Sequence, residues 1–134
     1  MAAMTTSFPG SCLCGLVRFV ITPPTKWCAH CHCTMCQRAH GAAFVTWVGV
    51  SEAQFELVAG RDTVHWYASS PDSRRGFCRH CGSSLFFRSE RWPGEVHVAR
   101  AAVPGEIDRE PDEQVHTDTR VPWLHEGAPT VGQP

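Results

Sequence analysis

Eight cysteines, grouped in three clusters, constrain the folding of this 134-residue chain more than any other feature. Cys12 and Cys14 form a CxC pair, and Cys78 and Cys81 form a CxxC pair that is followed by Gly82. The middle cluster places four cysteines in one short segment, at positions 28, 31, 33 and 36. Sulfur ligands at these spacings are typical of metal sites, so the sequence predicts that bound metal ties the fold together.

The N-terminal residues and the lack of a long apolar segment indicate a cytoplasmic protein. The segment MAAMTTSFPG has neither the basic region nor the apolar region of a secretory signal. The longest apolar stretch, residues 42–50, contains Thr46 and is too short to span a bilayer. Because the cytoplasm keeps thiols reduced, we expect cysteines that bind metal rather than form disulfides. A secreted disulfide domain made by another route is the alternative.

The net charge limits which partners are expected, and the length indicates how many domains the chain forms. The formal net charge is -1 and the pI is near 6.7, with no basic stripe, so neither nucleic acid nor an anionic membrane is expected as a partner. The length fits a single domain over residues 1–134 with one modest core. The sequence gives no indication of the oligomeric state.

Most of the chain between the cysteine clusters is predicted to form short strands. Runs rich in β-branched and aromatic residues alternate with turns that contain proline, glycine or aspartate. Helical candidates are short: residues 34–39, which Gly41 would end, and a turn at SEAQF, which Ser51 would cap. The fold class is therefore mostly β with one or two short helices. The predicted strands are residues 16–21, 43–50, 63–67, 75–78, 84–88 and 95–99.

The composition shifts at about residue 103, after which five of the ten prolines occur. We expect an irregular, proline-rich C-terminal arm rather than a second domain. Val121, Trp123 and Leu124 are the apolar residues predicted to pin this arm to the sheet.

The outer cysteine pairs together offer four thiolates for one tetrahedral site. Cys12 and Cys14 point to the same side of an extended chain. The two-residue spacer between Cys78 and Cys81 is the tight turn that lets two sulfurs meet one zinc. Joining the pairs would close residues 15–77 into one loop. A structural zinc stabilises small peptides by roughly 10–16 kcal/mol, although eight cysteines also permit other partitions.

The inner cluster combines both spacings in Cys31, Cys33 and Cys36, which an extended step leading into a short helix could bring to one ion. The fourth coordination position is undecided by spacing alone. Cys28 lies three residues before Cys31, which is itself a zinc spacing, and could close the site. The alternative, which we expect, is that Cys28 is a small buried residue.

These residues resemble the glutathione-dependent formaldehyde-activating family. The resemblance is carried by GSCLCGLVRF, CHCTMCQRAHGAAF, FCRHCGSSLFF, EVHVA and the later His116, Arg120 and Trp123, in order over roughly residues 8–126. It implies a zinc-stapled β-tent with antiparallel sheets around two zinc ions. It also implies a structural zinc on the outer cysteines and a catalytic zinc on the inner ones, namely Cys12, Cys14, Cys78 and Cys81, and Cys31, Cys33 and Cys36.

The activity implied by the resemblance is that of a carbon–sulfur lyase of the S-(hydroxymethyl)glutathione synthase type. Its substrates would be glutathione, or a similar thiol, and formaldehyde or another small aldehyde. Cationic side chains would be needed for the two carboxylates of glutathione. The candidates are Arg38, Arg74, Arg75, Arg88 and Arg91.

Histidines near the clusters are weaker candidates. His30 and His32 flank the inner cysteines, and His32 should point away from them because it alternates with Cys31 and Cys33. His97 is expected to pack within a strand, and His116 matches a family position without a role that the sequence can assign.

Two other functions stay open at this point. If Cys28 closes the inner site, the chain could be a non-catalytic zinc module that binds a protein partner. The labile inner cysteines could also make it a thiol-based zinc or redox sensor. The aromatic residues that could then line a partner groove, or form a core, are Trp47, Trp66, Phe86, Phe87 and Trp92.

Overall fold

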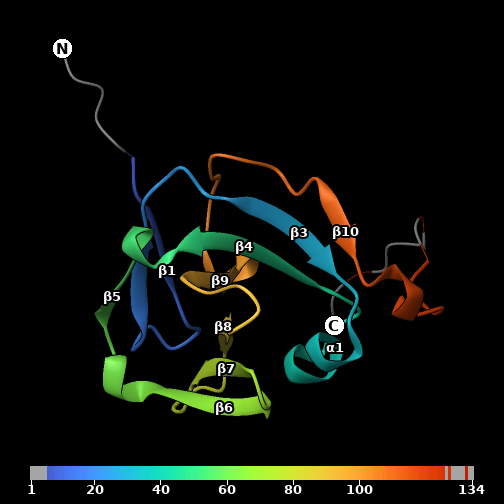
Figure 1. Cartoon of the computed structure of the whole chain (residues 1–134), viewed down its shortest axis with the longest axis horizontal. Helices are drawn as coiled ribbons and strands as arrows, with labels where there is room; N and C mark the ends of the chain where they lie inside the picture. Colours follow the sequence, from blue (N-terminus) through green and yellow to red (C-terminus); the bar gives the residue numbers. More distant parts are fainter. Residues whose placement is uncertain (1–5, 126, 128–131, 133–134) are drawn as a thin grey trace.

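The computed structural model describes residues 6–125, 127 and 132, which form ten strands in two sheets and one α-helix. The three-stranded sheet has the order β1-β2-β5, and the seven-stranded sheet has the order β10-β3-β4-β9-β8-β7-β6 (Figure 1). The mostly β prediction is therefore confirmed. The strands are β1 (Phe8–Ser11), β2 (Arg18–Ile21), β3 (Trp27–Cys31), β4 (Val45–Ser51), β5 (Phe55–Ala59), β6 (Val64–Ser70), β7 (Ser73–Cys78), β8 (Ser84–Ser89), β9 (Glu95–Ala99) and β10 (Glu113–Val115).

The seven-stranded sheet curls strongly, from β10 and β3 at one end to β6 at the other (Figure 1). Neighbouring strands are antiparallel except for β10 and β3, which are parallel. The three-stranded sheet covers one face, and the core between the two sheets we call the sheet-interface core. Its fully buried members include Phe19, Ile21, Cys28, Val48, Val50, Phe86, Val96 and Val98.

The central strands β4 and β9 are buried along nearly their whole length, which explains their near-continuous apolar sequences. Alternate residues of each strand point to the sheet-interface core or to the opposite, inner face of the curled sheet. In β9, Val96 and Val98 face the core, whereas His97 faces inward. The inner face carries the candidate site.

The α-helix α1 (Thr34–His40) follows β3 directly and has the predicted position. Cys33 is its first flanking residue, and Gly41 ends it with φ 60°, a left-handed conformation that glycine adopts without strain. None of the helices in the described part of the chain is long and apolar enough to cross a bilayer.

Four strands, β1, β3, β5 and β10, were not predicted. Three of them carry weak local signals: β1 contains Pro9 and Gly10, β3 contains two cysteines and a histidine, and β10 is the short polar segment EQV. The fourth, β5, has the mostly apolar sequence FELVA and was missed. Pairing with neighbouring strands determines their conformation. The predicted turn at SEAQF forms as a 3-10 helix over Glu52–Gln54, with Ser51 at its N-cap position. The Ser51 hydroxyl does not cap a backbone amide, however, and donates to Oε1 of Gln54 instead.

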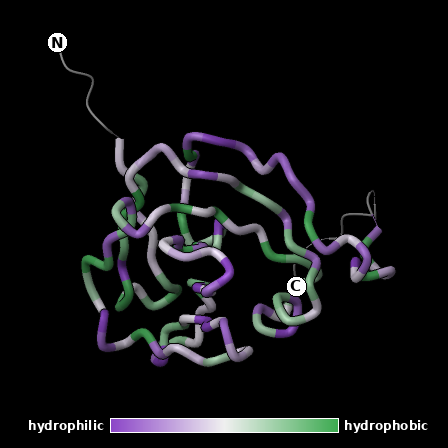
Figure 2. The backbone as a smooth tube through the Cα atoms, viewed as in Figure 1, coloured by the Kyte–Doolittle hydropathy of each residue, from purple (hydrophilic) through white to green (hydrophobic). Residues whose placement is uncertain are grey.

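The C-terminal arm contacts the sheet at different places from those predicted. Trp123 and Leu124 are 63% and 46% exposed, so the prediction that they pin the arm is wrong. Instead, the buried Thr25 accepts and donates hydrogen bonds with Asp108 and Arg109, and β10 pairs with β3. Figure 2 shows that the outer rim leading to β10 is mostly hydrophilic, which accounts for the missing apolar signal.

Candidate functional site

The four outer cysteines come together although more than sixty residues separate the pairs. Their sulfur atoms all lie within 4.8 Å of one another. The distance between the sulfurs of Cys12 and Cys14 is 3.5 Å, and that between Cys14 and Cys78 is 3.8 Å. Each pair sits in a tight turn that is followed by a left-handed glycine, Gly15 or Gly82, both with φ 82°.

The sulfur spacing fits a tetrahedral zinc site. Four sulfurs at the usual Zn–S distance of about 2.3 Å would lie roughly 3.8 Å apart, whereas a disulfide requires about 2.05 Å. All eight cysteines are free thiols. The hydroxyl and backbone amide of Ser83 lower the pKa of Cys81 to about 5, which favours the thiolate. The backbone hydrogen bond with Leu16 lowers the pKa of Cys14, but burial and the three neighbouring sulfurs outweigh it and raise that pKa to about 12. The outer cluster could therefore hold zinc.

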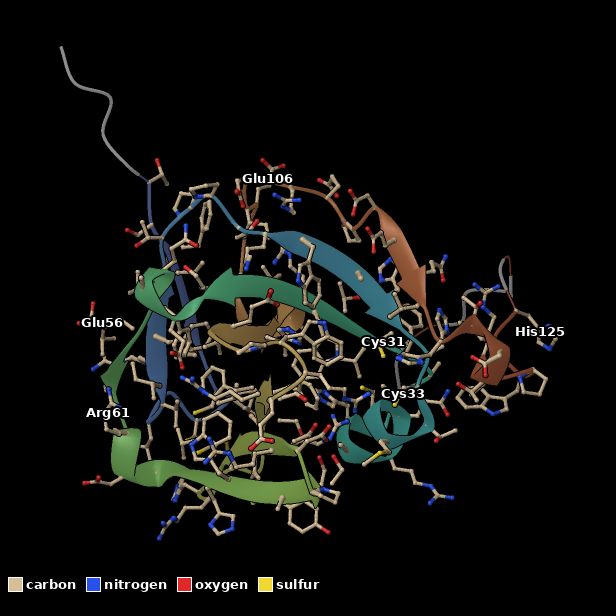
Figure 3. All side chains as sticks on the ribbon, viewed as in Figure 1. Cys31, Cys33, Glu56, Arg61, Glu106 and His125 are labelled. Atoms are coloured by element: carbon tan, nitrogen blue, oxygen red, sulfur yellow. The ribbon has the colours of Figure 1, made fainter. Side chains whose placement is uncertain are left out.

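The three inner cysteines come together at the junction between β3 and α1. Cys31 ends the strand, Cys33 flanks the helix, and Cys36 lies in its first turn. Their sulfurs also lie within 4.8 Å of one another, with 3.6 Å between Cys31 and Cys36. Figure 3 labels Cys31 and Cys33 where the end of β3 meets α1. We call these three residues the inner triad.

Cys28 belongs to neither sulfur group. It lies three residues before Cys31 on the same strand and therefore points to the opposite face. Its side chain is fully buried in the sheet-interface core, beside its cross-strand partner Val48. Burial raises the pKa of the Cys28 thiol, which favours the neutral form.

The inner triad opens onto a cavity of about 390 Å³ on the inner face of the curled sheet. Strand β3 contributes Trp27 and Ala29 to its wall, and β4, β8 and β9 contribute Trp47, Phe87 and His97. The opposite wall comes from the hairpin of β6 and β7 and from the loop after β8. Strand β10 contributes Glu113 and Val115. His116, which follows β10, also lines the cavity and is a non-glycine residue in the left-handed region with φ 56°.

Arg75 on β7 brings a positive charge to the inner triad. Its two terminal nitrogens donate to the sulfur of Cys36 at 3.7 Å each, and its guanidinium stacks over Phe87 at 5.0 Å from the ring centroid. The hydrogen bond with Cys31, opposed by burial and helped by Arg75, lowers the pKa of Cys36 to about 5. The same hydrogen bond, together with burial, raises the pKa of Cys31, so without a cation the negative charge of the pair resides on Cys36.

His97 is held in the cavity wall by a hydrogen-bond network. Its Nε2 lies 3.0 Å from Oε1 of Glu95, which also accepts from the indole of Trp27, while Lys26 pairs with the other carboxylate oxygen at 3.0 Å. His97 is buried, as predicted, but it also lines the cavity. Sequence analysis missed Glu95 and Trp27. Glu95 lies two positions before His97, and Trp27 lies four positions before Cys31. Residues at even spacing on a strand face the same side, so this pattern could have identified both.

Some of the other predicted residues line the cavity, and the rest lie elsewhere in the fold. Of the five candidate arginines, Arg75 and Arg91 line the cavity, whereas Arg38, Arg74 and Arg88 do not. His32 points away from the triad, as expected, and contacts Gln114 through Nε2 at 2.7 Å. Of the five aromatic residues, Trp47, Phe87 and Trp92 line the cavity, Phe86 is in the core, and Trp66 packs against that core.

Fold and site together define a mostly β domain with two cysteine clusters that could hold metal, one of which faces a cavity. A family model described as glutathione-dependent formaldehyde-activating enzyme matches residues 7–119. The chain belongs to this family.

The proteins similar to this chain include two curated proteins and a crystal structure. A protein of Halomonas elongata named "Putative glutathione-dependent formaldehyde-activating enzyme" is 32% identical over 80% of this chain and 71% of its own length. A Schizosaccharomyces pombe protein named an uncharacterized lyase is 33% identical over 60% of this chain and 56% of its own length. A crystal structure of a Rhodobacter sphaeroides protein shares the fold, with a TM-score of 0.61 and 22% identity, over 79% of this chain and 98% of the other.

Proposed function

We propose that this chain is a cytoplasmic, zinc-dependent carbon–sulfur lyase that adds glutathione or a similar thiol to formaldehyde or another small aldehyde. The outer cysteines would hold a structural zinc and the inner triad a catalytic zinc. The observation that carries the proposal is the position of the triad in the wall of a cavity of about 390 Å³. That volume is within the usual range of roughly 300–1,000 Å³ for small-molecule sites.

When bound to the triad, zinc would supply a Lewis acid with a coordination position that is left for a substrate thiol, which it would hold as the thiolate at neutral pH. The residues around it fit this use. Arg75 offsets part of the negative charge of three thiolates. The rings of Trp27, Trp47 and Phe87 give the cavity an apolar wall that limits the access of water to the reacting groups.

The proposed reaction joins the thiol sulfur to the carbonyl carbon of formaldehyde. As the carbon–sulfur bond forms, the π electrons of the carbonyl move to its oxygen. This oxygen takes up the proton that the thiol releases, so a hydroxymethyl thioether is the only product. His97 is available to carry that proton, because burial lowers its pKa against the opposing effect of Glu95 and keeps the ring neutral at pH 7.

The names of the two curated relatives support both parts of the proposal, since one names glutathione and formaldehyde and the other names a lyase. The rival function as a non-catalytic module required Cys28 to close the inner site. The position of Cys28 in the sheet-interface core, apart from the inner sulfurs, supports the enzyme over that alternative.

The test is the rate at which ¹³C-formaldehyde exchanges between its hydrate and the hydroxymethyl thioether of glutathione, measured by NMR exchange spectroscopy. The zinc-loaded chain should raise this rate above that of the thiol and aldehyde alone. Cys33→Ser should return the rate to this background. A zinc-loaded, folded chain that gives only the background rate would contradict the proposal.

A further inference from the structure

One wall of the cavity contains a strand irregularity that directs a hydroxyl toward the interior. In the hairpin of β6 and β7, the register shifts between Ala68 and Ser70, so Ser69 is the extra residue of a β-bulge. Bulges commonly redirect a side chain next to a functional site. Ser69 lines the cavity, and its Oγ is buried without a hydrogen-bond partner among the described residues.

The same wall contains a second buried polar atom without a partner, Nε of Arg75. Both terminal nitrogens of Arg75 contact the sulfur of Cys36. Because the guanidinium is planar, Nε then lies on the side of the group that points away from that sulfur. Of the three buried side-chain polar atoms without partners in the described chain, these two are in the cavity wall; the third is Nδ1 of His32.

A buried donor that lacks an acceptor is unfavourable, and two such donors in one cavity wall indicate a ligand that supplies acceptors. An arginine is positively charged at every physiological pH, so the preferred acceptor is an anion. The carboxylate of Glu113 lines the cavity but makes no hydrogen bond to Nε of Arg75. Glu95, which contacts His97 in the cavity wall, pairs with Lys26. The described chain therefore offers no carboxylate contact to Nε of Arg75.

We infer that Ser69 Oγ and Arg75 Nε form an anion subsite that takes a carboxylate of the thiol substrate. This inference rests on the proposed function and makes its substrate class more specific. The guanidinium of Arg75 separates this subsite from the sulfur of Cys36, because its terminal nitrogens contact that sulfur and its Nε faces the subsite. The favoured substrates are therefore thiols that carry a carboxylate a short distance from the sulfur, rather than neutral or cationic thiols.

The test compares two thiols of similar shape, 3-mercaptopropionate and the neutral 3-mercaptopropan-1-ol, by calorimetric titration of the zinc-loaded full chain. The wild type should bind the carboxylate about tenfold to hundredfold more tightly than the alcohol, as expected for hydrogen bonds to a charged group. Ser69→Ala should reduce this preference several-fold, and Arg75→Gln should reduce it by about tenfold or more.

Arg74→Gln is the matched control, because it makes the same change of charge at the next position of β7. The Arg74 guanidinium lies over Trp66, at 5.7 Å from the ring centroid, on the opposite face of the strand. This variant should keep the carboxylate preference. The zinc content of each variant is measured before titration, because Arg75 contacts a triad sulfur. Ser69 makes no such contact, so Ser69→Ala decides the matter if Arg75→Gln loses zinc.

An equal loss of affinity for both thiols in Ser69→Ala and Arg75→Gln, or an unchanged preference in Ser69→Ala, would overturn the subsite. The outcome is separable from that of the proposed function. Formaldehyde turnover without a carboxylate preference would reject the subsite alone. A carboxylate preference without turnover would support the subsite and reject the proposed reaction.

Discussion

Cys28 and Cys31 show how one strand can send two cysteines to different chemical environments. They are three positions apart on β3, so their side chains lie on opposite faces of the sheet. Cys31 joins the inner triad, whereas Cys28 packs among apolar residues of the sheet-interface core. Their CxxC spacing suits a zinc turn only where the chain folds back on itself, as it does between Cys78 and Cys81.

Cys28→Ala should keep two zinc ions per chain and the full rate of formaldehyde exchange. The variant removes only a buried sulfur, so the free energy of unfolding should fall by about 1 kcal/mol. X-ray absorption at the zinc edge measures the average number of sulfur ligands. A decrease of about half a ligand, averaged over two sites, would identify Cys28 as a zinc ligand.

At the scale of elements, the pairing of β3 with β4 positions the cavity wall. Trp27 lies directly opposite Gly49 in the antiparallel register, and its indole lies across that position. A Cβ atom at Gly49 would be 2.2 Å from Cε2 of the indole, which is far closer than atoms can approach. Glycine is therefore required so that Trp27 can cover β4 and donate to Glu95.

Gly49→Ala should lower the free energy of unfolding by about 1–3 kcal/mol, because the added methyl group overpacks the contact with Trp27. Urea unfolding measures the change as a lower midpoint at an unaltered slope. In Trp27→Leu the obstructing ring is absent, so adding Gly49→Ala to that variant should cost clearly less. Equal costs in the two backgrounds would show that Trp27 is not the cause.

At the scale of the whole molecule, the outer cysteines join the start of the chain to the end of β7. Cys12 and Cys78 are 4% and 0% exposed and belong to the sheet-interface core itself. A metal held there would connect both sheets. The inner triad, by contrast, lies at one end of the inner face, where β3 meets α1.

Cys78→Ser should give an unfolded or insoluble chain, because metal binding and folding are coupled at the outer cluster. Cys33→Ser, the matched change in the inner triad, should stay folded and lose about half of the zinc. Circular dichroism and zinc analysis distinguish the two variants. A chelator should remove the inner zinc first. Loss of both ions in one step that also unfolds the wild type would show that the inner site is structural.

The sequence by itself determined the features that depend on a few neighbouring residues. The spacings in Cys12–Cys14, Cys31–Cys36 and Cys78–Cys81 set which sulfurs can meet within each cluster, and the order of the clusters identified the family. Gly41 marked the end of α1, and runs of β-branched and aromatic residues marked six of the ten strands. Once β3 is known to be a strand, the alternation of side chains also predicts that Cys28 and Cys31 lie on opposite faces of the sheet.

Only the tertiary structure decided which residues surround the inner triad. Arg75 reaches Cys36 from a position 39 residues away, and Ser69 enters the cavity through a bulge that exists only when β6 pairs with β7. Strand β10 has a polar sequence and forms by pairing with β3. These features depend on contacts between distant segments, whose energies no local pattern records, so they appear only when the curled sheet brings those segments together.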